Sequence, residues 1–170
     1  MKTYKKFLIA LIPGSFVLGL TGCDLAPDSG SWRGTATVSD TLYGHSSCSV
    51  ELNLTHNEET VTVHKIESNC AQVVTTWDAV SFDVHGDQLW KDNRVVGRAS
   101  ERGSVSFELN DPYLDNRFPY PARKVIVTWT KVGNDLEFTE DTYFEGRTHR
   151  VHAWLKKQSS GGTSGTISWD

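Results

Sequence analysis

The feature that most constrains the fold is an alternation of apolar and polar residues with a period of two, repeated through most of residues 31–157. In one such run, Val105, Phe107 and Leu109 alternate with serine and glutamate. Successive side chains of a strand point to opposite faces, so this pattern is typical of strands that cover a core on one side. No window shows the period of a long amphipathic helix. The pattern predicts an all-β protein with about eight to ten short strands.

Short turn signals separate these runs at intervals of about ten residues. Asp92-Asn93 and Gly133-Asn134 each stand between two apolar runs, as expected of links between neighbouring antiparallel strands. Closing such a meander removes its exposed strand edges. We therefore expect a single antiparallel up-and-down barrel over residues 31–157, with a β-sandwich as the alternative. A long run at residues 73–84 and a loop at residues 111–123 interrupt the rhythm.

The cysteines Cys48 and Cys70 flank a predicted hairpin whose polar turn spans residues 56–59. The turn contains the midpoint of the two positions, so folding the hairpin about it brings the two sulfurs together. We therefore predict a disulfide between Cys48 and Cys70. The alternation slips near His64-Lys65, which predicts a β-bulge there. The alternative, a thiol pair for catalysis or metal binding, lacks the Cys-x-x-Cys spacing.

Residues 1–22 have the pattern of an export signal, a basic start followed by an apolar run that is short and broken for a membrane span. They lead into Leu20-Thr21-Gly22-Cys23, which resembles the lipobox of bacterial lipoproteins. The resemblance implies that the signal peptide is cleaved, that Cys23 becomes the acylated N-terminus, and that residues 23–30 form a lipidated tether. The alternative is a plain signal peptide, or an uncleaved anchor.

An exported lipoprotein lies in the cell envelope and faces the periplasm, where disulfides persist. Asp24 resembles the inner-membrane retention signal of enterobacterial lipoproteins. If Asp24 acts as that signal, the protein is anchored in the inner membrane; otherwise it is anchored in the outer membrane. The chain holds 17 basic and 21 acidic residues, and cleavage before Cys23 removes three lysines but no acid. Such a chain is not attracted to anionic headgroups or to phosphate backbones. We therefore expect membrane contact through the acyl chains and no nucleic-acid partner.

The first predicted strand begins with Gly30-Ser31-Trp32, which is similar to the Gly-x-Trp at the start of the lipocalin barrel. Lipocalins and their calycin relatives are eight-stranded barrels that commonly hold a small apolar ligand. The resemblance implies that Trp32 packs beneath the barrel floor against a basic residue from the last strand. Arg150 or Lys156 is positioned for that role, and we take Arg150 as the partner.

The sequence contains no motif that specifies a reaction, a cofactor or a metal site. His149 and His152 lie three apart in a predicted strand, so their rings point to opposite faces and cannot share a metal ion. We expect the histidines to lie at the surface or at strand edges. We expect no cofactor, no metal and no enzymatic activity.

Aromatic residues are abundant, with six tryptophans, five tyrosines and seven phenylalanines. They either fill the barrel or line a cavity or an interaction surface. The candidate binding tryptophans are Trp77, Trp90 and Trp129. The loop at residues 111–123 holds three of the five prolines together with Tyr113, Phe118 and Tyr120. Rigid aromatic loops are frequent binding surfaces, and a loop packed as a lid is the alternative.

Two functions follow from these features. The first is a lipid-anchored envelope protein that binds a small apolar or amphipathic ligand inside a lipocalin-like barrel. The second is a protein–protein interaction module, an inhibitor of a hydrolase or an assembly partner, which acts through residues 111–123. Residues 158–170 are rich in serine and glycine, and we expect them to form a mobile tail.

Overall fold

The computed structural model describes residues 26–70, 73–77, 79–112, 114–116 and 121–159. The described residues form twelve strands and no helix. The strands are β1 (Gly30–Asp40), β2 (Gly44–His56), β3 (Thr60–Cys70), β4 (Val73–Trp77), β5 (Val80–His85), β6 (Gln88–Lys91), β7 (Arg94–Ser100), β8 (Ser104–Asn110), β9 (Leu114–Asn116), β10 (Lys124–Val132), β11 (Asp135–Phe144) and β12 (Arg147–Lys157).

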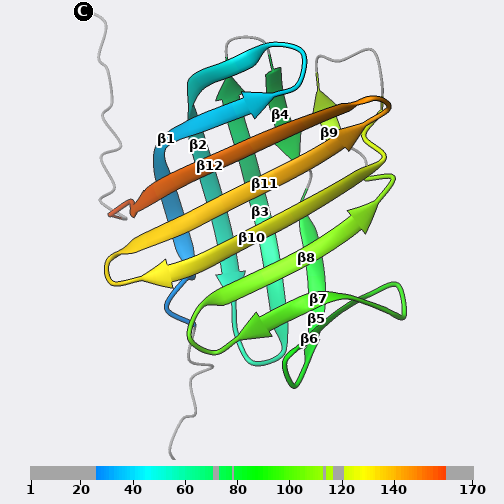
Figure 1. Ribbon diagram of the computed structural model, residues 1–170. Coiled ribbons are helices and arrows are strands. Elements are labelled where there is room, and N and C mark those ends of the chain that lie inside the picture. The colour runs from blue at the N-terminus through cyan, green and yellow to red at the C-terminus, as the bar shows by residue number, and fades with distance from the viewer. Residues whose placement is uncertain (1–25, 71–72, 78, 113, 117–120, 160–170) are drawn as a thin grey trace, which may run out of the picture.

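The sheet closes on itself as a barrel-like ring (Figure 1). Its order is β1, β2, β3, β5, β6, β7, β8, β10, β11 and β12, and β12 pairs again with β1. Each pairing is antiparallel, and ring neighbours follow one another in the chain apart from the skipped β4 and β9. The predicted all-β, up-and-down architecture is therefore confirmed, with ten strands in the ring. Closure leaves these ten strands few open edges.

The backbone conformation of the β6–β7 turn agrees with the turn predicted at Asp92-Asn93. Asp92 and Asn93 have φ values of 51° and 60°, and two left-handed residues in succession match the right-handed twist of a two-residue hairpin. The predicted bulge is confirmed in the β2–β3 pair. Asn53 pairs with Lys65 and Leu54 pairs with Val63, so His64 is the extra residue. Its ring Nε2 lies 2.8 Å from the hydroxyl of Thr55.

Two segments differ from the predicted rhythm. The run at residues 73–84 is divided into β4 and β5, because each pairs with a different half of β3. Residues 60–63 of β3 pair with β5, whereas residues 67–70 pair with β4. The segment at 111–123, predicted to be a loop without a strand, contains β9, which pairs with β4. Hydrogen bonding to that strand edge explains why three residues of the loop become extended.

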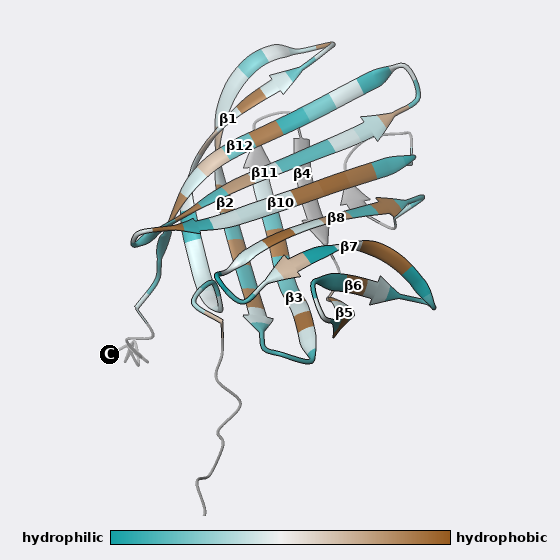
Figure 2. Ribbon diagram, turned by 60° about the horizontal axis from the view of Figure 1, so that its bottom comes forward, coloured by the Kyte–Doolittle hydropathy of each residue, from teal (hydrophilic) through white to brown (hydrophobic). Residues whose placement is uncertain are grey.

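Alternate residues of the strands point inward and form one apolar core, and Figure 2 shows the resulting stripes along β2 and β3. The largest fully buried rings are Trp32, Trp129, Phe82, Phe107 and Phe138. The Phe107 centroid lies 4.6 Å from that of Phe82 and 6.0 Å from that of Trp129. Phe82, Phe107 and Trp129 thus meet in the interior between β5, β8 and β10. Trp32 and Trp129 therefore fill the barrel rather than line an open cavity.

Cys48 is disulfide-bonded and lies on the inward face of β2. The last described pairs at this end of the hairpin are Val50 with Ser68 and Ser49 with Asn69. Continuing that register by one residue sets Cys48 opposite Cys70, whose side chain lies outside the described part of the chain. The Cys48–Cys70 pairing is therefore consistent with the strand register and stays a prediction.

Candidate functional site

The segment before β1 covers one end of the barrel. The Ala26 amide donates to the carbonyl of His56 over 2.8 Å. The Ser29 hydroxyl donates to the same carbonyl over 2.9 Å and accepts from the His56 amide over 2.8 Å. Residues 26–29 are thus held against the β2–β3 turn. Within the predicted tether at residues 23–30, Asp28 and Ser29 are buried against the end of β2.

Asp28 is the centre of this contact and is fully buried. Its carboxylate accepts a hydrogen bond from Trp129 Nε1 over 2.6 Å and contacts His56 Nδ1 at 2.9 Å. Its backbone carbonyl accepts from Trp32 Nε1 over 2.6 Å. A buried carboxylate is costly unless hydrogen bonds replace its water shell, and these donors do so. Asp28 thereby joins the N-terminal segment to β1, β2 and β10.

The adjacent β7–β8 turn comes close to Asp28 because it contains Gly103. Gly103 has a φ of 80°, and a Cβ at this position would lie 3.1 Å from the Cβ atoms of both Asp28 and Lys131. A side chain here would combine a strained backbone with a tight contact. The glycine lets the turn lie against the buried aspartate.

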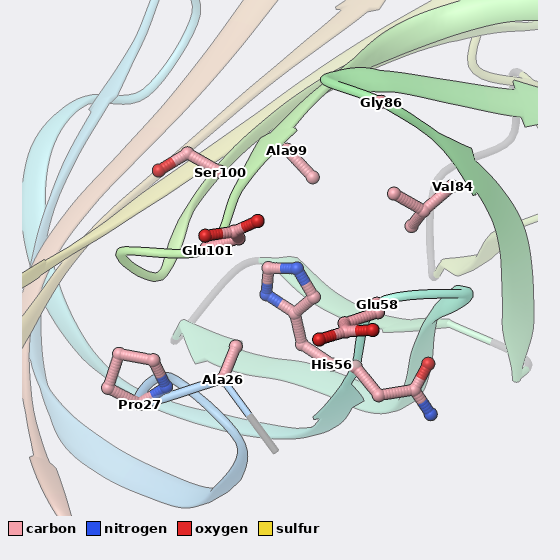
Figure 3. A pocket seen from close by; sticks show the side chains of 10 residues that line it. Ala26, Pro27, His56, Glu58, Val84, Gly86, Ala99, Ser100 and Glu101 are labelled. Atoms are coloured by element: carbon pink, nitrogen blue, oxygen red, sulfur yellow. The ribbon is translucent and has the colours of Figure 1, made fainter. Parts of the chain in front are cut away.

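His56 is oriented by the same aspartate. Its Nδ1 must carry the hydrogen that bonds to the Asp28 carboxylate, because a carboxylate can only accept. The side chain is only 4% exposed. Its Nε2 has no hydrogen-bond partner among the described residues, and the ring projects into an open cavity (Figure 3). In the neutral ring, Nε2 is therefore an acceptor directed at that cavity.

The cavity at this end of the barrel, which we call the end cavity, has a volume of about 470 Å³. It lies between the N-terminal segment and three turns, β2–β3, β5–β6 and β7–β8 (Figure 3). Its lining mixes apolar and polar residues: Ala26, Pro27, His56, Asn57, Glu58, Val84, Gly86, Ala99, Ser100 and Glu101. A concave surface with an apolar part and a few polar groups is typical of small-molecule sites.

A second cavity of about 570 Å³ opens in the wall of the barrel. It forms because β7 pairs with β8 only through residues 97–100 of β7. The preceding residues of β7 diverge from β8 and stay paired with β6. The part of β8 beyond this pairing is left open on that side. Val80, Val96 and Leu109 line this wall cavity, and it ends at Asp111 and Pro112.

A buried ionic cluster closes the seam between β1 and β12. Arg147 Nε donates to both carboxylate oxygens of Asp40, at 3.0 and 2.9 Å, and His149 Nδ1 lies 2.9 Å from Oδ2. The same carboxylate accepts from the amides of Leu42 and Tyr43. All three ionic side chains are less than a tenth exposed. The cluster therefore pins the β1–β2 turn to the start of β12.

These contacts shift two pKa values in the cluster. Burial by itself raises the pKa of Asp40, but hydrogen bonds from Arg147, Leu42 and His149 outweigh it and hold that pKa far below its usual range. Burial lowers the pKa of His149, against the opposing effect of Asp40. We infer that this cluster is structural: an ionised Asp40 bonded to Arg147, next to a neutral His149.

The prediction that the histidines lie at the surface or at strand edges is wrong for His56 and His149, which are 3% and 1% exposed. Each is buried because it lies beside a buried aspartate that binds its Nδ1. The predicted opposite orientations of His149 and His152 are observed, since His152 faces outward beside Glu137. Among the described residues, no group of three or more His, Cys, Asp or Glu side chains is arranged to hold a metal ion.

The structure places the two residues of the predicted barrel-floor pair, Trp32 and Arg150, apart from each other. Trp32 is fully buried, but Arg150 is far from it along β12 and forms an exposed ion pair with Asp141 at 2.6 Å. The cations above the Trp32 ring are Lys131 and Lys157, at 5.4 and 5.5 Å from its centroid. The reason is register, because β1 and β12 pair Trp32 with Lys157.

The other candidate residues have different positions. Trp129 is buried and binds Asp28. Trp90 is half-buried, its ring meets His85 edge-on at 5.8 Å, and its Nε1 has no partner among the described residues. The described part of the chain does not include Cys23, Tyr113, Phe118, Tyr120 or the side chain of Trp77. The predictions for these five residues therefore lie outside the described part of the chain.

Sequence reasoning missed Asp28 and His56, the residues that shape the end cavity. Asp28 lies in a polar stretch, and His56 belongs to a predicted turn, so neither pattern indicated burial. The one available signal was parity, because His56 continues the inward series of Leu52 and Leu54.

Comparisons with known proteins assign no family to this chain. No protein-family model matches it, and a search of curated proteins finds no relative. The described residues also contain no helix of the length and apolarity needed to cross a bilayer.

Proposed function

We propose that this protein is a lipid-anchored binding protein of the cell envelope, which takes a small amphipathic ligand in its end cavity. The observation that carries the proposal is the mixed lining of that cavity around His56 Nε2. The buried rings fill the barrel beside it, so the ligand binds at the barrel end rather than in its centre. The lipocalin-like interior site is thereby replaced by a site at the rim.

The position of the end cavity supports a role at the membrane. Ala26 lines the cavity and lies three residues after Cys23, the proposed acylation site. An extended chain spans at most about 3.5 Å per residue, so three residues allow a separation of at most roughly 10 Å between the two positions. With Cys23 lipidated, the cavity opens close to the membrane that holds the anchor, and an amphipathic ligand reaches it directly from the bilayer.

Binding is favoured over catalysis by the surroundings of His56. A histidine held by an aspartate is a frequent general base, and in the Ser–His arrangement it is hydrogen-bonded to the side-chain nucleophile. Ser100 supplies the only hydroxyl among the described lining residues. Its Oγ accepts from the Arg102 amide over 3.1 Å and has no described hydrogen bond to His56. We therefore assign His56 a binding role.

The second candidate function is a protein–protein interaction through residues 111–123. One observation favours it: the wall cavity ends at Asp111 and Pro112, where that segment begins. A partner that grips the segment also finds an apolar recess in Val80, Val96 and Leu109. The proposed location is the same for both functions, the periplasmic face of the inner membrane if Asp24 acts as a retention signal and of the outer membrane otherwise.

The ligand site is tested by filling the end cavity. The full chain is embedded in phosphatidylcholine vesicles and labelled with a dodecanol analogue that carries a diazirine in its chain. We expect cross-links on peptides that contain residues 26–27, 56–58 and 99–101. The substitution Ala26→Trp should abolish them, because the new ring occupies the cavity without disturbing a ladder hydrogen bond. Ala79→Trp, in the wall cavity, is the matched control and should leave them unchanged. Absence of cross-links to these peptides in the unaltered protein would refute the proposed function.

The proposal gives each of the three cysteines a role: Cys23 carries the lipid, and Cys48 and Cys70 form a disulfide. Non-reduced peptide mapping of the full chain taken from membranes should find acyl chains on Cys23 and a cross-link between Cys48 and Cys70. In the chain-entropy treatment, a disulfide that closes a loop of this length stabilises by about 3 kcal/mol. Replacing both Cys48 and Cys70 by alanine should lower the free energy of unfolding by about that amount. A Cys23–Cys48 cross-link would contradict both the anchor and the hairpin disulfide.

A further inference from the structure

The charges around the end cavity restrict which amphipathic ligand it accepts. Its ionisable lining residues are Glu58, Glu101 and His56, and no lysine or arginine is among the described residues that line it. The wall cavity differs, because Lys91 and Arg94 line it together with acidic residues. The charged groups of the end cavity are thus acidic, whereas the wall cavity has both acidic and basic ones.

The two glutamates of the end cavity have no basic partner among the described residues. Neither Glu58 nor Glu101 forms an ion pair with any described residue. The outward-facing acids of β11 behave differently, since each is paired with a basic residue of β12. These pairs are Asp135 with Lys156, Glu137 with His152 and Asp141 with Arg150. Unpaired carboxylates beside a concave surface of low dielectric attract cations and repel anions.

His56 adds an acceptor to these charges. Its Nδ1 hydrogen is committed to Asp28, so the neutral ring presents the Nε2 lone pair to the cavity. In Figure 3 the ring projects into the space that Glu58, Ser100 and Glu101 surround. Behind the ring lies the fully buried carboxylate of Asp28, a third negative group. The polar groups directed at the cavity therefore favour a positively charged hydrogen-bond donor.

We propose that the ligand of the end cavity is an alkylammonium compound, an amphiphile whose polar end is a protonated amine. This inference rests on the proposed function and specifies its ligand. The ammonium group donates to His56 Nε2 and to the carboxylates of Glu58 and Glu101. The alkyl chain lies against the apolar lining, which includes Pro27, Val84 and Ala99. Fatty acids and phosphate headgroups are disfavoured, because their negative charge meets the same carboxylates.

The test compares three competitors with equal chains in the vesicle labelling experiment at pH 7: octylamine, octanoate and octanol. An aliphatic amine is protonated at this pH, as lysine is. We expect octylamine to halve the labelling of the end cavity at a concentration at least about tenfold lower than octanoate does. Octanol should lie between them, because it has the chain without the charge.

Two variants connect the preference to the named residues. The double substitution Glu58→Gln and Glu101→Gln should reduce the ratio between octanoate and octylamine to about threefold or less, because it removes both exposed charges. Both side chains are exposed at turns, so the fold should tolerate the change. Glu108→Gln, in the wall cavity, is the control and should leave the ratio unaltered.

The outcomes separate this inference from the proposed function. If octanol displaces the label while octanoate competes as well as octylamine, the end cavity binds amphiphiles but the ammonium assignment is wrong. If the double variant keeps the full preference for octylamine, the glutamates do not cause it and the assignment is again wrong. If the end cavity takes up no label, the proposed function itself fails.

Discussion

Replacing Asp40 by asparagine should lower the free energy of unfolding by about 3–5 kcal/mol, which is the usual cost of breaking a buried ion pair from one side. The carboxylate and the guanidinium of Arg147 are 3% and 7% exposed as side chains, so water cannot replace the lost charge. The substitution keeps the shape of the side chain, and the loss therefore reports the charge. Urea denaturation followed by circular dichroism measures it.

Asp141→Asn is the matched control, because it removes the same charge from an exposed pair. The Arg150 side chain is 59% exposed, and such pairs contribute about 0.2–1 kcal/mol. An equal loss in the two variants would contradict the structural role of the buried cluster. The unfolding pathway need not be known, because the comparison uses only the difference between two otherwise identical proteins.

The Asp40 effect should also depend on pH in a definite direction. The pKa of Asp40 is held well below the value that it has in the unfolded chain, so the folded protein keeps this group ionised in weak acid. Its contribution is therefore fully present above the unfolded pKa and is lost as the pH falls through the folded pKa. The part of the difference in free energy of unfolding between wild type and Asp40→Asn that comes from the Asp40 charge should therefore narrow only in acid below the unfolded pKa of aspartate.

Replacing Trp129 by alanine should have an effect of similar size, about 3–5 kcal/mol. The side chain is fully buried, stacks edge-on against Phe107, and donates its indole hydrogen to Asp28. The substitution leaves a cavity in the core and removes one of the hydrogen bonds that satisfy a buried carboxylate. Thermal and urea denaturation should show the loss together with a lower transition temperature.

Trp154→Ala is the control on a neighbouring part of the same sheet. Trp154 lies on the outer face of β12 and is 47% exposed, so its removal should cost less than about 1 kcal/mol. Trp129→Phe separates the effect of the core cavity from that of the lost hydrogen bond, because it keeps most of the ring but removes the donor to Asp28. The free energy of unfolding should then fall by about 1–3 kcal/mol. Similar losses for Trp129→Ala and Trp154→Ala would contradict the assignment of Trp129 to the core.

Much of the fold was predictable because its signals are local. The alternation within Ser104–Asn110 predicts β8, and Asp92-Asn93 predicts the turn between β6 and β7. The bulge at His64 was visible as a slip in the same alternation. Segment 73–84 was harder to divide, because its break depends on β3 pairing with two different strands.

The candidate site was less predictable, because its residues meet only in three dimensions. Asp28 and Trp129 are 101 positions apart, yet their hydrogen bond closes one end of the barrel. Arg150 was a reasonable partner for Trp32 by residue type. The β1–β12 register instead sets Lys157 opposite Trp32, seven positions further along the strand. At about 3.3 Å per residue, that offset moves a side chain by more than 20 Å.

The sequence by itself determined the strand content, the turns and the up-and-down order, because a period of two and turn chemistry act over a few neighbouring residues. Only the tertiary structure decided which polar groups are buried and where cavities remain. The burial of Asp28, His56 and Asp40 depends on donors from distant strands, and without those donors the same side chains would stay in water. The end cavity exists because the N-terminal segment and three turns converge around one of these buried groups.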